Sequence, residues 1–262
     1  RWSQGDTPLA TVLGDAEAFA TERLPRLLIS GHAEASVLEE AASLVGIPAH
    51  LICQLGGRLP PSRFSRELLA HRGLVGGLYD ASVTARDPFP HRERYRGPDP
   101  TLFGIERVFT AGINTHLRRT LQVDTERDYH LLSMAVNKAW KIDGERHALE
   151  SQVGAADDLR YAMSLNPHMQ VRISHGYYDL VTPYFSSNRL AGLMGLGGDA
   201  PTGRAESPVG APAVYGNLSL KHYLGGHMFY TWDASRRAFR DDIRHFYSRA
   251  QSPTPGRGEG LP

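Results

Sequence analysis

Two short segments in the last third of the chain contain residue types that perform acid–base chemistry. The segment His175–Tyr184 contains an aspartate, Asp179, and the segment Gly225–Tyr230 contains a histidine, His227. Histidine is the side chain that most readily exchanges a proton near neutral pH. A carboxylate that accepts a hydrogen bond from histidine Nδ1 fixes the tautomer that leaves Nε2 as a base. The two segments therefore predict an Asp–His acid–base couple.

Each of these two residues follows a predicted strand. Residues Val171–Gly176 favour a strand that ends at a glycine, and Leu218–Leu224 alternates with a period of two before a Gly-Gly break. Adjacent parallel strands lie about 4.8 Å apart, and their carboxyl ends meet at one edge of a sheet. We therefore expect Asp179 and His227 to be in contact. Taken singly, Asp179 is better explained as a turn or capping aspartate, and His227 as a histidine that merely follows a strand, so the prediction rests on the two residues together.

A nucleophile does not accompany this couple in the sequence. An aspartate followed by a histidine, with a serine earlier in the chain, is the order found in α/β hydrolases, where the serine lies in a G-x-S-x-G turn. That pentapeptide occurs nowhere in the 262 residues. Cys53 lies in a helical context without flanking glycines, and Ser174 lies inside a predicted strand. Among these residues the sequence therefore offers no convincing nucleophile for the couple.

The elements expected to position these residues differ between the two parts of the chain. Apolar spacings of three and four predict helices over 8–29, 33–45, 49–55, 62–71 and 101–121. A loop is predicted over 73–100, and 124–157 is mixed in character. Further on, the sequence predicts a helix over 157–165 and a helix to Met194 with Thr182 as its N-cap and Pro183 at its first position. It also predicts a long loop over 197–216 and a helix that Asp233 caps. Strand, helix, strand, helix is typical of a parallel α/β layer.

Composition and charge exclude several classes of function. The formal net charge is +1, which makes the chain a poor candidate for binding nucleic acid. No apolar run approaches the length of a membrane span. The single cysteine and the lack of an H-E-x-x-H motif argue against a metal site. The glycine-rich stretch Gly195–Ala200 follows a helix, so it does not fit a dinucleotide fingerprint. We expect no metal and no cofactor.

The segments Asn166–Phe185 and Tyr223–Tyr230 together resemble the serine carboxypeptidase-like family of α/β hydrolases, in its bacterial branch. The Gly-His-Met tripeptide and the G-x-x-D-x-x-T-P pattern carry this resemblance. It extends from about Phe19 to Tyr247 and covers only the C-terminal half of such a protein. The Gly197–Gly216 loop is longer than the family usually has at this point.

The resemblance implies roles for individual residues. Asp179 is expected to be the triad acid and His227 the general base. Met228 is expected to border the pocket for the leaving residue. Independently of the resemblance, Tyr178 is expected to contact the substrate, although the tyrosines near Asp179 are equally explained as core residues. The serine turn and the oxyanion hole would lie in a missing N-terminal half. The implied substrate is a peptide with a free C-terminus, and the implied location is periplasmic or secreted, with its signal upstream.

These expectations define an α/β fold class, as the C-terminal part of an α/β-hydrolase fold. Residues 1–156 are expected to form a mainly helical cap, 157–250 the last part of the hydrolase core, and 251–262 a disordered tail. Two parallel strands are too few for a stable open sheet, so the rest of the sheet is expected from the missing N-terminal half. Two alternatives remain open: a non-catalytic truncated interaction or scaffold protein, and an acyltransferase or esterase of the same fold.

Overall fold

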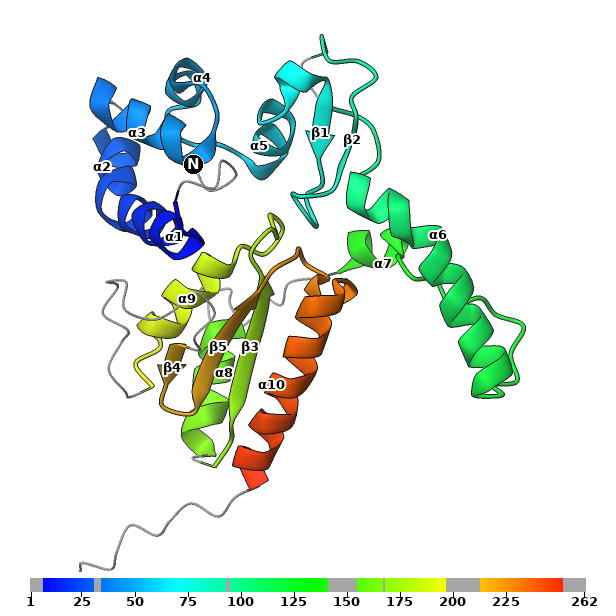
Figure 1. Cartoon of the computed structure of the whole chain (residues 1–262). Coiled ribbons are helices and arrows are strands. Elements are labelled where there is room, and N and C mark those ends of the chain that lie inside the picture. The colour runs from blue at the N-terminus through cyan, green and yellow to red at the C-terminus, as the bar shows by residue number, and fades with distance from the viewer. Residues whose placement is uncertain are drawn as a thin grey trace, which may run out of the picture. The chain divides into compact units, whose positions relative to one another are not determined.

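The chain combines helices with two small sheets, which confirms a mixed α/β class (Figure 1). The computed structural model describes residues 7–30, 34–92, 95–140, 155–166, 168–196 and 213–251. These residues fall into two compact units. The first contains residues 7–23 together with the described residues from Ala156 onward, and the second is Leu24–Ala155.

The Leu24–Ala155 unit is mainly helical. Its buried apolar side chains include Leu27, Ile47, Ile52 and Val75. The Asp99 carboxylate begins helix α6 by accepting hydrogen bonds from the backbone N–H groups of the next turn. The elements of this unit are α2 (Leu24–Ser30), α3 (Ala35–Val45), α4 (Ala49–Gln54), α5 (Pro61–Glu67), a 3-10 turn (Ala70–Arg72), β1 (Leu74–Gly76), β2 (Thr84–Arg86), α6 (Pro100–Thr115), a π-helical turn (His116–Thr120) and α7 (Met134–Ala139).

The prediction of a loop over 73–100 was partly wrong. Strands β1 and β2 form an antiparallel hairpin within it, with Leu74 opposite Arg86. A buried ion pair of 3.2 Å between Arg66 Nε and Asp87 Oδ2 joins α5 to the residue that follows β2. Strands of three residues are too short to produce a recognisable alternation, which explains why the sequence pattern missed this hairpin.

The other unit contains a three-stranded sheet in the order β3-β5-β4. Strands β3 and β5 are parallel, and Gly176 lies opposite Tyr223 where they end. The elements of this unit are α1 (Leu9–Ala18), a π-helical turn (Phe19–Arg23), α8 (Ala155–Leu165), β3 (Val171–Gly176), α9 (Tyr184–Leu193), β4 (Ala213–Tyr215), β5 (Leu218–Tyr223), a 3-10 turn (Phe229–Thr231) and α10 (Asp233–Gln251). Both predicted strands are therefore confirmed.

The prediction of a continuous loop over 197–216 was wrong at β4, which pairs antiparallel with β5. Residues 197–212 lie outside the described residues.

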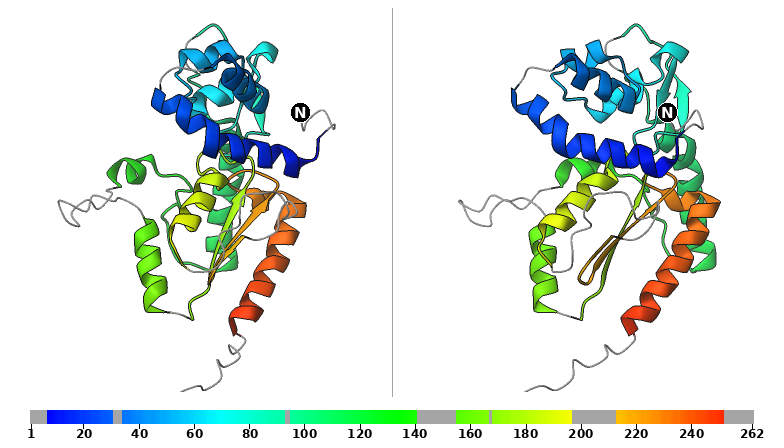
Figure 2. Two further views of the ribbon diagram at one scale, coloured as in Figure 1. Left: turned by 90° about the vertical axis from the view of Figure 1, so that its left-hand side faces the viewer. Right: turned by 60° about the vertical axis from the view of Figure 1, so that its left-hand side comes forward.

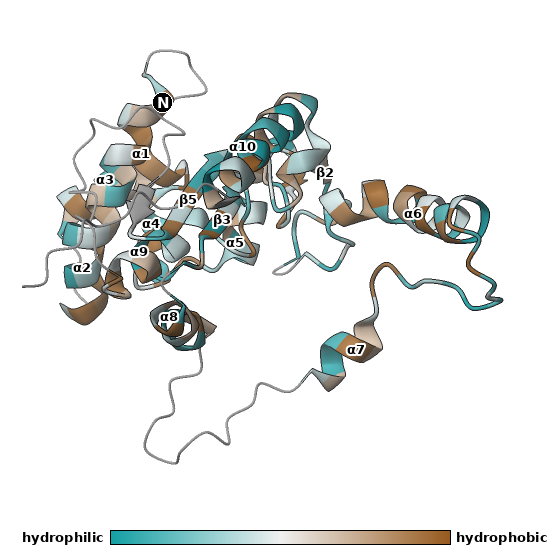
Figure 3. Cartoon of the chain, turned by 90° about the horizontal axis from the view of Figure 1, so that it is seen from below, coloured by the Kyte–Doolittle hydropathy of each residue, from teal (hydrophilic) through white to brown (hydrophobic). Residues whose placement is uncertain are grey.

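Helices cover both faces of this sheet (Figure 2). On one face, Leu218 and Leu220 of β5 pack against Met163 of α8 and Ala191 of α9. On the other face, the Tyr223 hydroxyl donates a 2.8 Å hydrogen bond to Asp242 of α10. The remaining surface of α10 is largely hydrophilic (Figure 3). The period-two alternation of β5 thus separates an apolar face from a more polar one.

The predicted helix over 8–29 is observed as α1, a π-helical turn and α2 in direct succession. The division between the two units falls within this run, because residues 7–23 group with the sheet. The Tyr184 hydroxyl donates a 2.9 Å hydrogen bond to Glu17 Oε1, which connects α1 to α9. The expected boundary near residue 156 lies at the observed division, but the sequence pattern assigned the first helix to the cap. Of the predicted tail, residues 251–262, Gln251 instead ends helix α10, and residues 252–262 lie outside the described residues.

Candidate active site

Asp179 and His227 are joined by a hydrogen bond at the carboxyl edge of the sheet. The distance from His227 Nδ1 to Asp179 Oδ2 is 2.7 Å. The Asp179 side chain is only 2% exposed, whereas that of His227 is 41% exposed. A buried carboxylate therefore orients an imidazole that solvent can reach, as expected from the two strand-end segments.

Backbone contacts hold the two loops together beyond the ends of the strands. The N–H of Tyr177 donates to the carbonyl of Tyr223 at 3.0 Å, and the N–H of Tyr178 donates to the carbonyl of Gly225 at 2.9 Å. A Cβ atom at Gly176 would lie far inside van der Waals contact with the carbonyl oxygens of Gly225 and Gly226. The glycines thus allow the close approach that brings Asp179 to His227.

Asp179 accepts four hydrogen bonds. Its Oδ1 accepts from the N–H groups of Val181 at 2.8 Å and Thr182 at 3.0 Å. Its Oδ2 accepts from the Thr182 hydroxyl at 2.6 Å and from His227. Burial by itself raises the pKa of Asp179, but the hydrogen bonds from Thr182, His227 and Val181 outweigh it and hold the pKa below its usual value of 3.8. The carboxylate is therefore ionised at neutral pH.

The interpretation of Thr182 as a helix cap was wrong. Helix α9 begins at Tyr184 with Pro183 in the N-cap position and without a side-chain cap. The Thr182 hydroxyl instead lies 2.6 Å from Asp179 Oδ2 and 3.2 Å from His227 Nδ1. Its position three residues after the aspartate places both residues in one tight turn, but this spacing alone does not show which way the hydroxyl points.

Two histidines that the sequence did not single out lie between the sheet and α9. His175 Nε2 is 2.8 Å from Ser187 Oγ, and His222 Nε2 is 2.9 Å from Asn188 Oδ1. The two residues are opposite each other in the β3–β5 register, and their rings are stacked with centroids 6.4 Å apart. The aromatic rings of Tyr177 and Tyr184 also contact His222.

Burial depresses the basicity of both histidines. It lowers the pKa of His175 below its usual 6.5, although the charge of Asp179 acts in the opposite direction. It also lowers the pKa of His222 to about 4, with further contributions from His175 and Lys221. Both rings are therefore neutral at pH 7, and they form a polar but uncharged layer at the end of the apolar core. Their signal in the sequence is only that they continue the inward-facing alternation of β3 and β5.

Met228 and Tyr178 flank the couple along the chain. The Tyr178 ring lies 5.8 Å from that of Trp232, between centroids. Met228 is partly buried and precedes the 3-10 turn Phe229–Thr231, with its carbonyl accepting a 2.8 Å hydrogen bond from the Thr231 N–H. Their proposed contacts with substrate stay predictions.

The two rejected nucleophile candidates belong to ordinary elements. Ser174 lies within β3, opposite Lys221 in the register. Cys53 is an exposed residue of α4 in the other unit.

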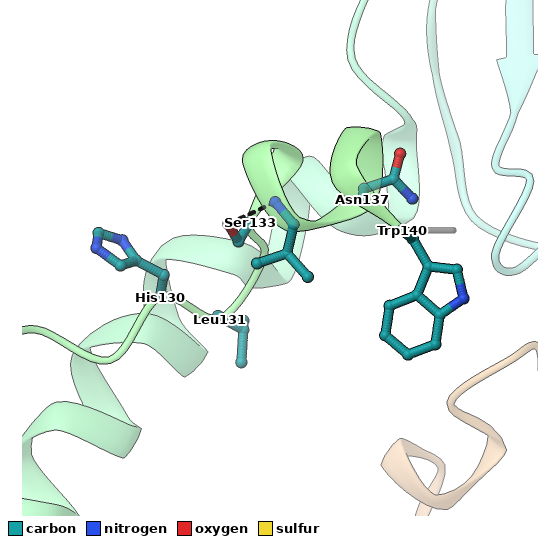
Figure 4. A pocket seen from close by; sticks show the side chains of 6 residues that line it. His130, Leu131, Ser133, Asn137 and Trp140 are labelled. Carbon is teal, nitrogen blue, oxygen red and sulfur yellow. Dashed lines mark hydrogen bonds between the residues drawn. The ribbon is translucent and has the colours of Figure 1, made fainter. Parts of the chain in front are cut away.

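Described residues of the Leu24–Ala155 unit line two hollows that could be considered as binding sites. The first, shown in Figure 4, is open and lined by His130, Leu131, Ser133, Val136, Asn137 and Trp140. The Ser133 hydroxyl in it accepts a 3.3 Å hydrogen bond from the Val136 N–H, which caps α7. The Ser133 hydroxyl is thus engaged in capping α7 and is not oriented for a ligand.

The second hollow contains charged groups that are engaged within the fold. Arg63 pairs with Glu67 at 3.1 Å, Arg66 pairs with Asp87, and Asp99 caps α6. Among the described residues, no group of three or more His, Cys, Asp or Glu side chains is arranged to hold a metal ion. The Asp179–His227 couple therefore remains the best candidate for chemistry.

No family model, curated protein or solved structure matches this chain significantly. Within the part of the chain that the structure describes, no helix is both long and apolar enough to cross a membrane.

Proposed function

We propose that Asp179 and His227 are the acid and the base of a serine hydrolase whose nucleophilic serine lies outside these 262 residues. The observation that carries this proposal is the 2.7 Å hydrogen bond from His227 Nδ1 to a buried Asp179. It fixes the tautomer in which Nε2 is unprotonated, which a general base requires. The complete protein would have the α/β-hydrolase fold, with β3 and β5 as strands of its sheet.

In this mechanism His227 Nε2 takes the proton of the serine hydroxyl while the serine oxygen attacks the scissile carbonyl carbon. The imidazolium then returns that proton to the leaving amine as the C–N bond breaks. A water molecule releases the acyl group by the same sequence of proton transfers. Asp179 stays ionised throughout and stabilises the imidazolium, which its low pKa favours.

The family resemblance supports a carboxypeptidase over other serine hydrolases. The G-x-x-D-x-x-T-P and Gly-His-Met patterns are the ones that typify the serine carboxypeptidase-like family. By that resemblance the substrate is a peptide with a free C-terminus and Met228 lies beside its terminal residue. Tyr178, which precedes Asp179 in the chain, is proposed to contact the same substrate. The same resemblance supports a periplasmic or secreted location and a reaction without a cofactor.

Turnover of matched peptides tests this proposal. The experiment uses the product of the longest reading frame that contains this chain, together with one peptide in its free-acid and its amidated form. We expect release of the last residue from the free acid only, and a loss of at least about 10³-fold in kcat for His227→Ala. His245→Ala is the matched control, because His245 is an exposed residue of α10, and this variant should retain full activity.

The outcomes separate the alternatives. Release that is unaffected by His227→Ala would overturn the proposal. Transfer of the acyl group to an added amine or alcohol, without hydrolysis of peptides, would assign the protein to the acyltransferases. The 262-residue chain alone should show no turnover, and activity of this chain that His227→Ala removes would contradict a nucleophile outside it.

A further inference from the structure

The Thr182 hydroxyl contacts both members of the couple. Its Oγ1 lies 2.6 Å from Asp179 Oδ2 and 3.2 Å from His227 Nδ1. The hydroxyl comes from the same tight turn as Asp179, since the N–H of Thr182 also donates to Asp179 Oδ1 at 3.0 Å. One threonine thus holds both oxygens of the carboxylate, one through its backbone and one through its side chain.

The ionised carboxylate fixes the direction of both hydrogen bonds to Oδ2, because it can only accept. The Thr182 hydroxyl therefore donates to Oδ2 at 2.6 Å, and the His227 Nδ1–H donates to the same oxygen at 2.7 Å. Oδ2 therefore accepts hydrogen bonds from two donors. The hydrogen bond from Thr182 draws on the negative charge of Oδ2 and thereby sets the strength of the hydrogen bond that Oδ2 accepts from His227.

We propose that Thr182 is a positioning residue that sets the orientation and the acceptor strength of Asp179 toward His227. The backbone N–H groups of Val181 and Thr182 hold Oδ1. The Thr182 hydroxyl holds the other oxygen, Oδ2, on the side of His227. The importance of this role for catalysis rests on the proposed function, but the arrangement itself is independent of any reaction.

The test uses Thr182→Val, which keeps the side-chain shape and removes the hydroxyl. Carboxyl ¹³C NMR of the 262-residue chain follows the ionisation of Asp179, and the downfield proton NMR signal of His227 Nδ1–H reports the shared hydrogen bond. Loss of a donor to the charged form raises the pKa of Asp179 toward 3.8. The Nδ1 proton should move further downfield, because Oδ2 then accepts from one donor only. Thr182→Ser, which keeps the hydroxyl, should restore both values.

A merely structural role for Thr182 predicts a different result. Thr182→Val would then change the free energy of unfolding and leave both NMR values unchanged in the folded protein, which would overturn the inference. If Thr182→Val fails to fold, Thr182→Ser and Thr182→Ala are compared instead. The inference requires the pKa of Asp179 and the His227 Nδ1 proton shift to differ between these two variants. Equal values in both variants would overturn it.

Kinetics in the complete protein separate this inference from the proposed function. Thr182→Val should lower kcat about tenfold with KM unchanged, since the hydroxyl contacts the couple and not the substrate. Changed NMR values together with an inactive wild-type protein would contradict the proposed function and leave the inference standing. An unchanged pKa of Asp179 and an unchanged His227 proton signal in an active enzyme would contradict the inference about Thr182 and leave the proposed function standing.

Discussion

Neutral histidines and an ionised aspartate lie side by side in this site. Asp179 is enclosed but receives hydrogen bonds from four donors, which favour its charged form. His175 and His222 are partly buried, and each ring has a neutral side chain at its Nε2, Ser187 and Asn188 respectively. Desolvation therefore dominates for the histidines, whereas hydrogen bonding dominates for the aspartate.

His222 gives a prediction for the dependence of stability on pH. Its folded-state pKa of about 4 lies below the usual 6.5, so the folded state favours the neutral ring. The contribution of His222 to the free energy of unfolding is complete above pH 6.5, falls as the pH drops below 6.5, and is lost by about pH 4. The difference corresponds to a maximum of about 3 kcal/mol, reduced by the part of the ring that solvent reaches.

Urea unfolding at pH 7.5 and pH 4.5 measures this contribution. In His222→Gln, which does not titrate, the free energy of unfolding should fall less between these two pH values than in the wild type. His130→Gln replaces an exposed histidine of the other unit and should behave as the wild type does. An identical fall in His222→Gln and the wild type would show that His222 is not buried as a neutral ring.

For individual residues, the sequence predicted the contact between Asp179 and His227 but not the side chains that surround it. Asp179 and His227 follow strands of clear pattern, so their contact could be derived from the geometry of a parallel sheet. Thr182 preceded a proline, which favoured a cap, because sequence spacing does not show that the hydroxyl turns back toward Asp179. His175 and His222 occupy inward-facing strand positions, where a histidine carries no signal that distinguishes packing from function.

The two loops at the end of β3 and β5 are the elements on which the site depends. Gly176 ends β3 and lies against the carbonyl groups of Gly225 and Gly226, while Gly225 has a φ of +121°. Side chains rarely adopt that conformation, so a glycine is needed at the break after β5. The separation between the Asp179 loop and the His227 loop is thus set by the backbone.

Gly176→Ala tests this dependence. The added methyl group has no space beside two backbone carbonyls, so the loops must move apart, and the free energy of unfolding should fall by about 2 kcal/mol or more. The downfield Nδ1 proton signal of His227 should weaken or vanish in the same variant. Gly14→Ala is the matched control, because Gly14 lies inside α1 with nothing near its added Cβ.

The control should be slightly more stable than the wild type, since alanine favours a helix by about 0.5–1 kcal/mol over glycine. A Gly176→Ala variant with unchanged stability and an unchanged proton signal would mean that the close approach of the two loops does not position the couple.

The long, well-patterned elements were the predictable ones. Helix 157–165 and strands 171–176 and 218–224 appear with nearly the expected bounds, because each has a consistent periodicity and a glycine or Asn-Pro stop. The β1–β2 hairpin and β4 were not predicted, since three residues do not establish a period. In these cases pairing with a neighbouring strand, rather than local preference, decides the structure.

For the molecule as a whole, sequence reasoning anticipated a division near residue 156 and a helical unit before it. It did not anticipate that α1 groups with the sheet, because the contact between Glu17 and Tyr184 joins positions far apart in the chain. Among the described strands, β3 is paired on one side only. A parallel sheet is normally extended and covered on both sides, which agrees with the proposal that further strands of the complete protein continue it.

The nucleophile is the part of the proposal that involves the whole protein. The measurement that tests it most directly is peptide mapping by mass spectrometry after a fluorophosphonate, which reacts covalently with an activated serine, has been added to the product of the longest reading frame that contains this chain. We predict one modified serine, within a G-x-S-x-G sequence outside these 262 residues, and no modification in His227→Ala. Modification of a residue within the 262, or modification that persists in His227→Ala, would contradict the account.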